Sequence, residues 1–254
     1  MARIGAQLYT VRETMQNLKD IRKTLKRIAE AGYTAVQLSA HGPVDPGDLA
    51  RVLEDCNLEV AATHMSWQRF LDDMPGVVAD HKTWRCRHAA IGALPPEYRD
   101  AEGLDRFLEE LPAAAEALAS EGIDFSYHNH SHEFVRLGDE TWLARLFARA
   151  EPALLKAELD TYWIQHGGGD PAHWIRRLAG RQPLLHLKDM TVTVQREQRF
   201  APIGEGNLNW PAVMEAAEQA GVEWYLVELD NCYGEDPVEC LARSHRFLRR
   251  FGME

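Results

Sequence analysis

Long apolar runs are missing from this chain of 254 residues, and so is any concentration of positive charge. No stretch reaches the roughly 20 apolar residues that a membrane-spanning helix needs, and the N-terminal MARIGAQLYTV has no signal-peptide pattern. No run of Lys and Arg is longer than two residues, and the formal net charge is −11, so nucleic-acid binding has little electrostatic support. We therefore expect a cytoplasmic protein with no nucleic-acid or membrane partner.

Cysteine pairs and glycine-rich nucleotide motifs are also absent. The four cysteines, at positions 56, 86, 232 and 240, form no CxxC pair, which predicts reduced thiols in place of disulfides or a zinc cluster. No GxGxxG follows the first β-like segment, and HGGGDP at 166–171 lacks the Lys-Ser/Thr of a phosphate-binding loop. These absences argue against a dinucleotide-binding open sheet.

Short β-like segments alternate with longer amphipathic segments along the whole chain, without a linker or a break in composition. Each β-like segment is followed by a helical pattern, such as 19–32, which closes on Gly32. The β-like segments are 3–9, 34–40, 59–66, 88–94, 124–130, 154–160, 183–189 and 224–230. About eight such pairs in a chain of this length predict an α/β fold, with residues 1–254 forming a single (β/α)8 TIM barrel.

Polar side chains gather where these predicted strands end, which is the face that carries the active site in such barrels. The strand-end residues are His64, the run HNHSHEF at 128–134, Asp160, His186, Lys188, Glu228 and Asp230. In LLHLKDM, alternation places His186 and Lys188 on one face and the leucines on the other. A lone carboxylate here is often only a helix cap, and a lone histidine is often a hydrogen-bonded core residue. Convergence of several such groups instead indicates a divalent cation, and oxygen ligands with an imidazole suit Mn, Mg, Co, Fe or Zn.

Six stretches carry a resemblance to a known family: GAQLYTVR, YHNHSHEF, LDTYW, HLKDM, PIGEGNLNW and VELDN. The chain resembles the sugar phosphate isomerase/epimerase superfamily, the xylose-isomerase-like barrels that include ketose 3-epimerases and inosose dehydratases. The resemblance implies one divalent ion, manganese first, with cobalt, magnesium, zinc or iron as alternatives. Carried over residue by residue, the implied metal ligands are Glu133, Asp160, His186 and Glu228.

The resemblance also implies an activity, namely isomerisation or epimerisation of a sugar or keto-sugar. Glu133 and Glu228 are then the catalytic residues, which remove and return a proton through a cis-enediolate. The expected substrate-binding residues are His64, Lys188, Gln7, His130 and Trp163. The expected partner is a small carbohydrate, and the family is compatible with a homo-oligomer.

Two positions depart from the pattern of ketose 3-epimerases. Trp163 stands where those enzymes carry a substrate-contacting histidine, and the arginine that often follows the ligand histidine is not evident, so Lys188 is the candidate for its charge. These differences argue against a plain ketohexose epimerase and favour a bulkier or already oxidised sugar, such as a 3-keto-glycoside.

Alternative functions remain open at this stage. Expulsion of a leaving group from the same enediolate makes the protein a metal-dependent lyase or dehydratase on a keto-sugar or keto-glycoside. A non-catalytic sugar-binding or partner subunit is a second alternative, although binding alone does not need two opposed carboxylates. A DNA-repair endonuclease of the same superfamily needs further metal ligands and a basic groove, which the charge of −11 disfavours.

Overall fold

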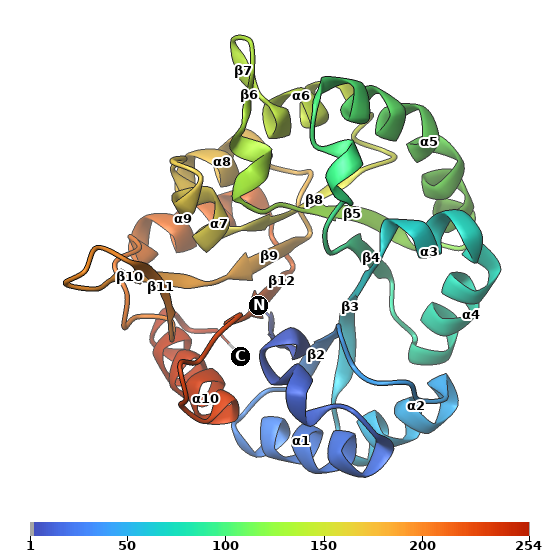
Figure 1. Ribbon diagram of the computed structural model, residues 1–254. Helices are drawn as coiled ribbons and strands as arrows, with labels where there is room; N and C mark the ends of the chain where they lie inside the picture. The colour runs from blue at the N-terminus through green and yellow to red at the C-terminus, as the bar shows by residue number, and fades with distance from the viewer. Residues whose placement is uncertain (1–2, 254) are drawn as a thin grey trace.

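The computed structural model describes residues 3–253 and arranges eight parallel strands as a closed barrel (Figure 1). Around the barrel the strands follow the order β1-β12-β9-β8-β5-β4-β3-β2. Their bounds are Arg3–Gln7 for β1, Ala35–Leu38 for β2, Glu59–Met65 for β3, His88–Ile91 for β4, Asp124–His128 for β5, Lys156–Asp160 for β8, Leu184–Leu187 for β9 and Trp224–Val227 for β12. The closed parallel barrel confirms the fold predicted from the alternating segments.

The α-helices form a ring outside the strands (Figure 1). They are α1 Leu18–Glu30, α2 Pro46–Asp55, α3 Trp67–Asp72, α4 Met74–Trp84, α5 Ala101–Ser120, α6 Trp142–Arg149, α7 Thr161–His166, α8 Pro171–Arg177, α9 Trp210–Ala220 and α10 Pro237–Leu248. Local sequence sets their ends: Asp170 and Asp236 accept hydrogen bonds from the first backbone N–H groups of α8 and α10, and a proline follows each aspartate. Gly32 ends the first repeat with φ +105°, a conformation that suits glycine.

Shorter elements follow several strand ends and the last helix. Two antiparallel hairpins pair β6 (Arg136–Leu137) with β7 (Glu140–Thr141), and β10 (Asp189–Val192) with β11 (Gln198–Ala201). Figure 1 shows the β10–β11 hairpin projecting from the barrel beside α9 and α10. The 3-10 segments are η1 Leu8–Thr14, η2 Pro96–Tyr98, η3 Ser131–Phe134 and η4 Arg249–Phe251. Because η1 and η3 follow β1 and β5 closely, they line the mouth of the barrel.

Side chains alternate between two environments along each strand. In β9, Leu185 and Leu187 point outward into the large apolar layer between strands and helices, whereas Leu184 joins a small apolar cluster inside the barrel. That inner cluster consists of Ala35, Ala61, Ala62, Leu184, Trp224 and Leu226. His186 points inward one step nearer the mouth, as the alternation in the sequence predicts. The barrel interior is therefore apolar at its base and polar at its mouth.

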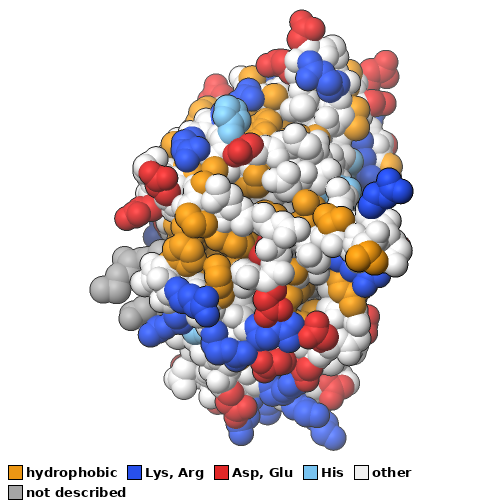
Figure 2. Space-filling model, turned by 90° about the vertical axis from the view of Figure 1, so that its left-hand side faces the viewer, with side chains coloured by type: hydrophobic (Ala, Val, Ile, Leu, Met, Phe, Trp, Pro, Cys, Tyr) orange, Lys and Arg blue, Asp and Glu red, His pale blue; other side chains and the backbone are white. Residues whose placement is uncertain are grey.

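Charges of both signs are mixed on the side of the molecule that carries the β10–β11 hairpin (Figure 2). Arginines of α1 and α10 pair with carboxylates, as in Arg27–Asp236 at 2.7 Å and Arg246–Glu239 at 2.8 Å. This face offers no continuous basic surface of the kind that binds nucleic acid. Among the described helices, none combines the length and the apolar character that crossing a membrane requires.

Candidate active site

Four polar residues from four neighbouring strands meet at the mouth of the barrel. His128 is the last residue of β5, Asp160 the last of β8, His186 lies in β9, and Glu228 directly follows β12. One side-chain atom from each residue lies within 4.8 Å of the others, and all four residues are buried. The Nδ1 atom of His186 is 2.8 Å from Glu228 Oε2, and the Nε2 atom of His128 is 3.2 Å from Asp160 Oδ2.

Lys188 brings a buried positive charge to the same place. Its Nζ atom lies 3.2 Å from Asp160 Oδ2, 2.9 Å from Glu228 Oε2 and 2.7 Å from Asp230 Oδ1, with 1% of the side chain exposed. Burial alone would lower the pKa of Lys188, but the carboxylates of Asp160, Glu228 and Asp230 outweigh burial and raise it. Lys188 therefore stays charged and compensates the carboxylates.

The donor set fits a divalent metal ion. Two imidazoles and two carboxylates form the mixed nitrogen and oxygen environment that suits manganese, iron, cobalt or zinc. The lysine contacts Asp160 Oδ2 and Glu228 Oε2, the atoms that stand closest to His128 and His186. An ion bound by all four residues must compete with the ammonium group for these oxygens, and Asp230 offers the lysine another partner.

A second layer of polar groups holds His186 from behind. The Nε2 atom of His186 lies 3.2 Å from Glu158 Oε1 and 2.7 Å from Gln37 Oε1. The other carboxylate oxygen of Glu158 is 2.6 Å from His64 Nε2, and its Oε1 also accepts a 2.7 Å hydrogen bond from Gln37 Nε2. Burial lowers the pKa of His186, but Glu158 and Glu228 outweigh burial and raise it to about 10. This layer fixes the orientation of the imidazole.

Glu133 does not join the other three predicted ligands in this structure. It lies in η3, where its Oε1 accepts a 2.8 Å hydrogen bond from the hydroxyl of Tyr127 and its Oε2 a 2.8 Å bond from the backbone N–H of His130. These two bonds turn the carboxylate back toward its own segment. His128 stands beside Asp160 instead.

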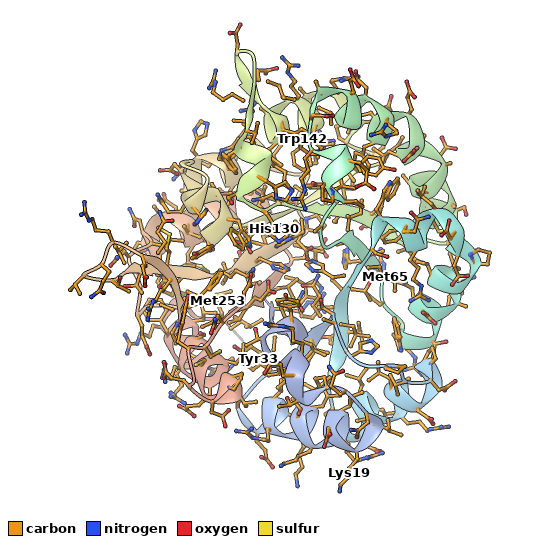
Figure 3. The ribbon with its side chains drawn as sticks, in the orientation of Figure 1. Lys19, Tyr33, Met65, His130, Trp142 and Met253 are labelled. Atoms are coloured by element: carbon orange, nitrogen blue, oxygen red, sulfur yellow. The ribbon has the colours of Figure 1, made fainter. Side chains whose placement is uncertain are left out.

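A cavity of about 360 Å³ reaches two of the four residues, His128 and Glu228. Its polar lining consists mainly of His64, His128, His130, Lys188, Glu228 and Asp230, with Tyr9 and Met65 among the remaining wall residues. Figure 3 shows His130 near the centre of the barrel in the axial view, with Met65 on the β3 side. Three of the five predicted substrate-binding residues, His64, Lys188 and His130, thus line the cavity.

The other two predicted substrate-binding residues lie one layer away from the cavity. Gln7 is fully buried and contacts Gln37 Oε1 at 3.0 Å and His64 Nδ1 at 3.2 Å, so it supports the wall. The Trp163 ring lies 5.2 Å from the ring of His130, and its indole N–H has no hydrogen-bond partner within residues 3–253. Trp163 of α7 and Phe200 of the β10–β11 hairpin also flank the Lys188 ammonium.

Asp189 anchors the loop that follows the hairpin, although the sequence marked this aspartate only as part of a strand end. Its carboxylate accepts the backbone N–H groups of Gly204, Gly206 and Leu208, the indole N–H of Trp210 and the N–H of Met190. The stretch GEGNLNW is therefore pinned by one buried carboxylate next to Lys188. In the sequence, only the position of Asp189 directly after Lys188, at the end of a predicted strand, indicated that this aspartate has a role near the site.

Known proteins are similar to this chain over most of its length. The sequence profile of the family "Xylose isomerase-like TIM barrel" matches residues 25–251. An inosose dehydratase of Geobacillus kaustophilus is 25% identical, in a match that covers 85% of this chain and 80% of that protein. The crystal structure of a sugar phosphate isomerase/epimerase from Parabacteroides distasonis superposes with a TM-score of 0.82 at 21% identity, covering 98% of each chain. An L-ribulose 3-epimerase superposes with a TM-score of 0.77 at 19% identity, covering 98% of this chain and 94% of that one.

Proposed function

This chain belongs to the family of xylose isomerase-like TIM barrels, and on that basis we propose that it is a metal-dependent enzyme acting on a keto-sugar or a keto-inositol. The observation that carries the proposal is the buried meeting of His128, Asp160, His186 and Glu228 beside a cavity of about 360 Å³. Charged groups are buried at high cost unless they are paired or bind a cation, so such a cluster beside an open cavity is typical of a functional site.

His128, Asp160, His186 and Glu228 are the residues that would hold the ion. Manganese is the first ion to test, followed by cobalt, magnesium, zinc and iron. When bound, a divalent ion polarises a carbonyl group and stabilises the negative charge that develops when the neighbouring carbon loses its proton. We propose this donor set in place of the one with Glu133 that the resemblance implies.

Only one of the two predicted catalytic glutamates is available from the cavity. Glu228 lines it, whereas Glu133 is engaged by Tyr127 and by the backbone of His130. Epimerisation by two opposed carboxylates needs one on each face of the substrate. The arrangement therefore favours elimination of water from a keto-substrate, in which the proton and the leaving hydroxyl depart on the same side.

Glu228 and Lys188 are placed to perform that elimination. The carboxylate of Glu228 takes the proton from the carbon beside the carbonyl, and the C–H electron pair forms the new C=C bond. As the adjacent C–O bond breaks, the carboxyl group of Glu228 gives that proton to the departing hydroxyl, which leaves as water, and Glu228 is again a carboxylate. The ammonium of Lys188, whose Nζ atom lies 2.9 Å from Glu228 Oε2, keeps its proton and stabilises that carboxylate.

Isomerisation or epimerisation is the second candidate, and His130 is the observation in its favour. The Nδ1 atom of His130 is buried without a hydrogen-bond partner among the described residues, and the side chain lines the cavity. Return of the proton by this imidazole to a different face or carbon would complete an epimerisation or an isomerisation.

The test is incubation of the metal-loaded protein in D2O with inosose and, separately, with fructose and tagatose, followed by mass spectrometry and NMR. Elimination predicts a product lighter by one water. A product that keeps the mass of the substrate apart from added deuterium, and whose NMR spectrum is that of an epimer or an isomer, would support the epimerase or isomerase instead. Glu228→Gln should abolish either product, and Glu235→Gln, an exposed glutamate of the same loop, is the matched control. No exchange and no product with any of these compounds would count against the proposal.

A further inference from the structure

We infer that His130, His132 and Glu133 form a second cation site beside the same cavity, which His130 lines. Each residue offers one ligand atom, and these atoms lie within 4.8 Å of one another. All three residues come from the short run NHSHE, residues 129–133, that follows β5. The inference concerns metal binding by this segment and does not depend on which reaction the enzyme catalyses.

Two buried nitrogen atoms of this cluster have no hydrogen-bond partner among the described residues. His130 Nδ1 and His132 Nε2 are buried and have no hydrogen-bond partner within residues 3–253. His132 Nε2 lies 3.0 Å from Glu133 Oε1, but the geometry is not that of a hydrogen bond. Because buried polar atoms in proteins are almost always satisfied, two free imidazole nitrogens beside a carboxylate point to a ligand that they share.

The carboxylate of Glu133 is held in place for this role. The Tyr127 hydroxyl and the backbone N–H of His130 each donate a 2.8 Å hydrogen bond to it. Ligating carboxylates are commonly hydrogen-bonded in this way, which fixes their orientation toward a metal. A capping box in η3 accounts for the bond from the backbone N–H of His130 and sets the His130 side chain against the backbone of Glu133, but it gives no partner to His132 Nε2.

The donor set suits a zinc ion with one open position. Two histidines and one glutamate are a common ligand set for catalytic Zn²⁺, which keeps a fourth position for water or substrate. His130 lines the cavity, and its ring lies 4.9 Å from that of His128, a proposed ligand of the first site. An ion held by His130 therefore faces the same substrate as the first site.

Metal stoichiometry tests the inference directly. The protein, stripped with a chelator, is equilibrated with excess Zn²⁺ and freed of unbound ion, and bound ions per chain are counted by native mass spectrometry. We expect two ions in the wild type and one in His132→Ala. Glu133→Gln, which keeps an oxygen for the Tyr127 hydroxyl, should also bind one. His173→Ala, at an exposed histidine outside both clusters, should still bind two.

His186→Ala separates this inference from the first site, because it should lose the first ion and retain the second. Visible spectra of Co²⁺-loaded protein should show the same pattern, with one set of bands missing in His132→Ala. A single ion in the wild type, lost in His186→Ala and retained in His132→Ala, would leave the first site standing and overturn the second. Two ions in both His132→Ala and Glu133→Gln would also overturn it. Circular dichroism of each variant verifies that the barrel is folded.

Discussion

Glu158 is not one of the proposed ligands of the first site, yet Glu158→Gln should weaken metal binding there. Glu158 is completely buried in β8, and its carboxylate lies behind His186, on the side of the ring that faces away from Glu228. Glutamine keeps the size of the side chain and one of its two oxygens. The substitution therefore removes the negative charge behind the imidazole while leaving the packing of the barrel interior nearly unchanged.

The magnitude follows from the role of such outer groups in metal sites. Loss of a carboxylate that orients a ligand histidine typically reduces metal affinity by about 10- to 100-fold, or about 1.4–2.7 kcal/mol. Gln37 Oε1, 2.7 Å from His186 Nε2, remains as a neutral partner for the ring. We therefore expect the reduction to lie at the lower end, near about 10-fold.

Competition with a chromophoric chelator measures the dissociation constants for Mn²⁺ and Zn²⁺ in the wild type and in Glu158→Gln. Glu223→Gln provides the control, because Glu223 precedes β12 at the opposite end of the barrel and is exposed. An unchanged affinity in folded Glu158→Gln would refute the reasoning, since it would mean that Glu158 does not orient His186 or that His186 does not bind the ion.

Three further perturbations have defined outcomes. Asp189→Asn leaves at least two of the five N–H donors around that carboxylate without an acceptor, and should lower the free energy of unfolding in urea by about 3–5 kcal/mol. Lys188→Met leaves three carboxylates without their cation, so thermal denaturation should show that the metal-free variant is less stable than the metal-free wild type. Added Mn²⁺ should then raise the melting temperature of the variant more than that of the wild type. Burial lowers the pKa of His81 below its ordinary 6.5, so the unfolded chain binds the proton more readily and stability should fall as the pH decreases below 6.5. Chemical denaturation at several pH values should show a smaller slope for His81→Gln, the difference being at most about 1.4 kcal/mol per pH unit.

Much of the barrel could be predicted from the sequence because alternation and strand ends are local properties. The alternation of Leu185, His186 and Leu187 specified which face of β9 carries chemistry, and the structure agrees. Within HNHSHEF the same reasoning was insufficient. The position where β5 stops decides whether His128 or a later residue points along the barrel axis, and a shift of one residue reverses the direction of every side chain.

The supporting layer was harder to predict because its contacts join distant strands. Glu158 and Asp160 alternate in KAELD, so the sequence contained a signal that both point inward. That Glu158 meets Gln37 and His64 depends on the stagger of β8 against β2 and β3 across the barrel, which no local pattern encodes. The hydrogen bonds that residues 204–210 donate to Asp189 depend in the same way on the path of the loop after β11.

A divalent ion held by the four strand-end residues should assist removal of a proton beside a carbonyl. The most direct measurement is the rate of deuterium incorporation from D2O into inosose by chelator-treated protein before and after Mn²⁺ is restored, with Asp160→Asn in parallel. Exchange should disappear on metal removal, return with the ion and be lost in the folded variant. Exchange at the same rate in the metal-free protein would show that no ion assists proton removal, and an undiminished rate in Asp160→Asn would show that Asp160 does not hold the ion.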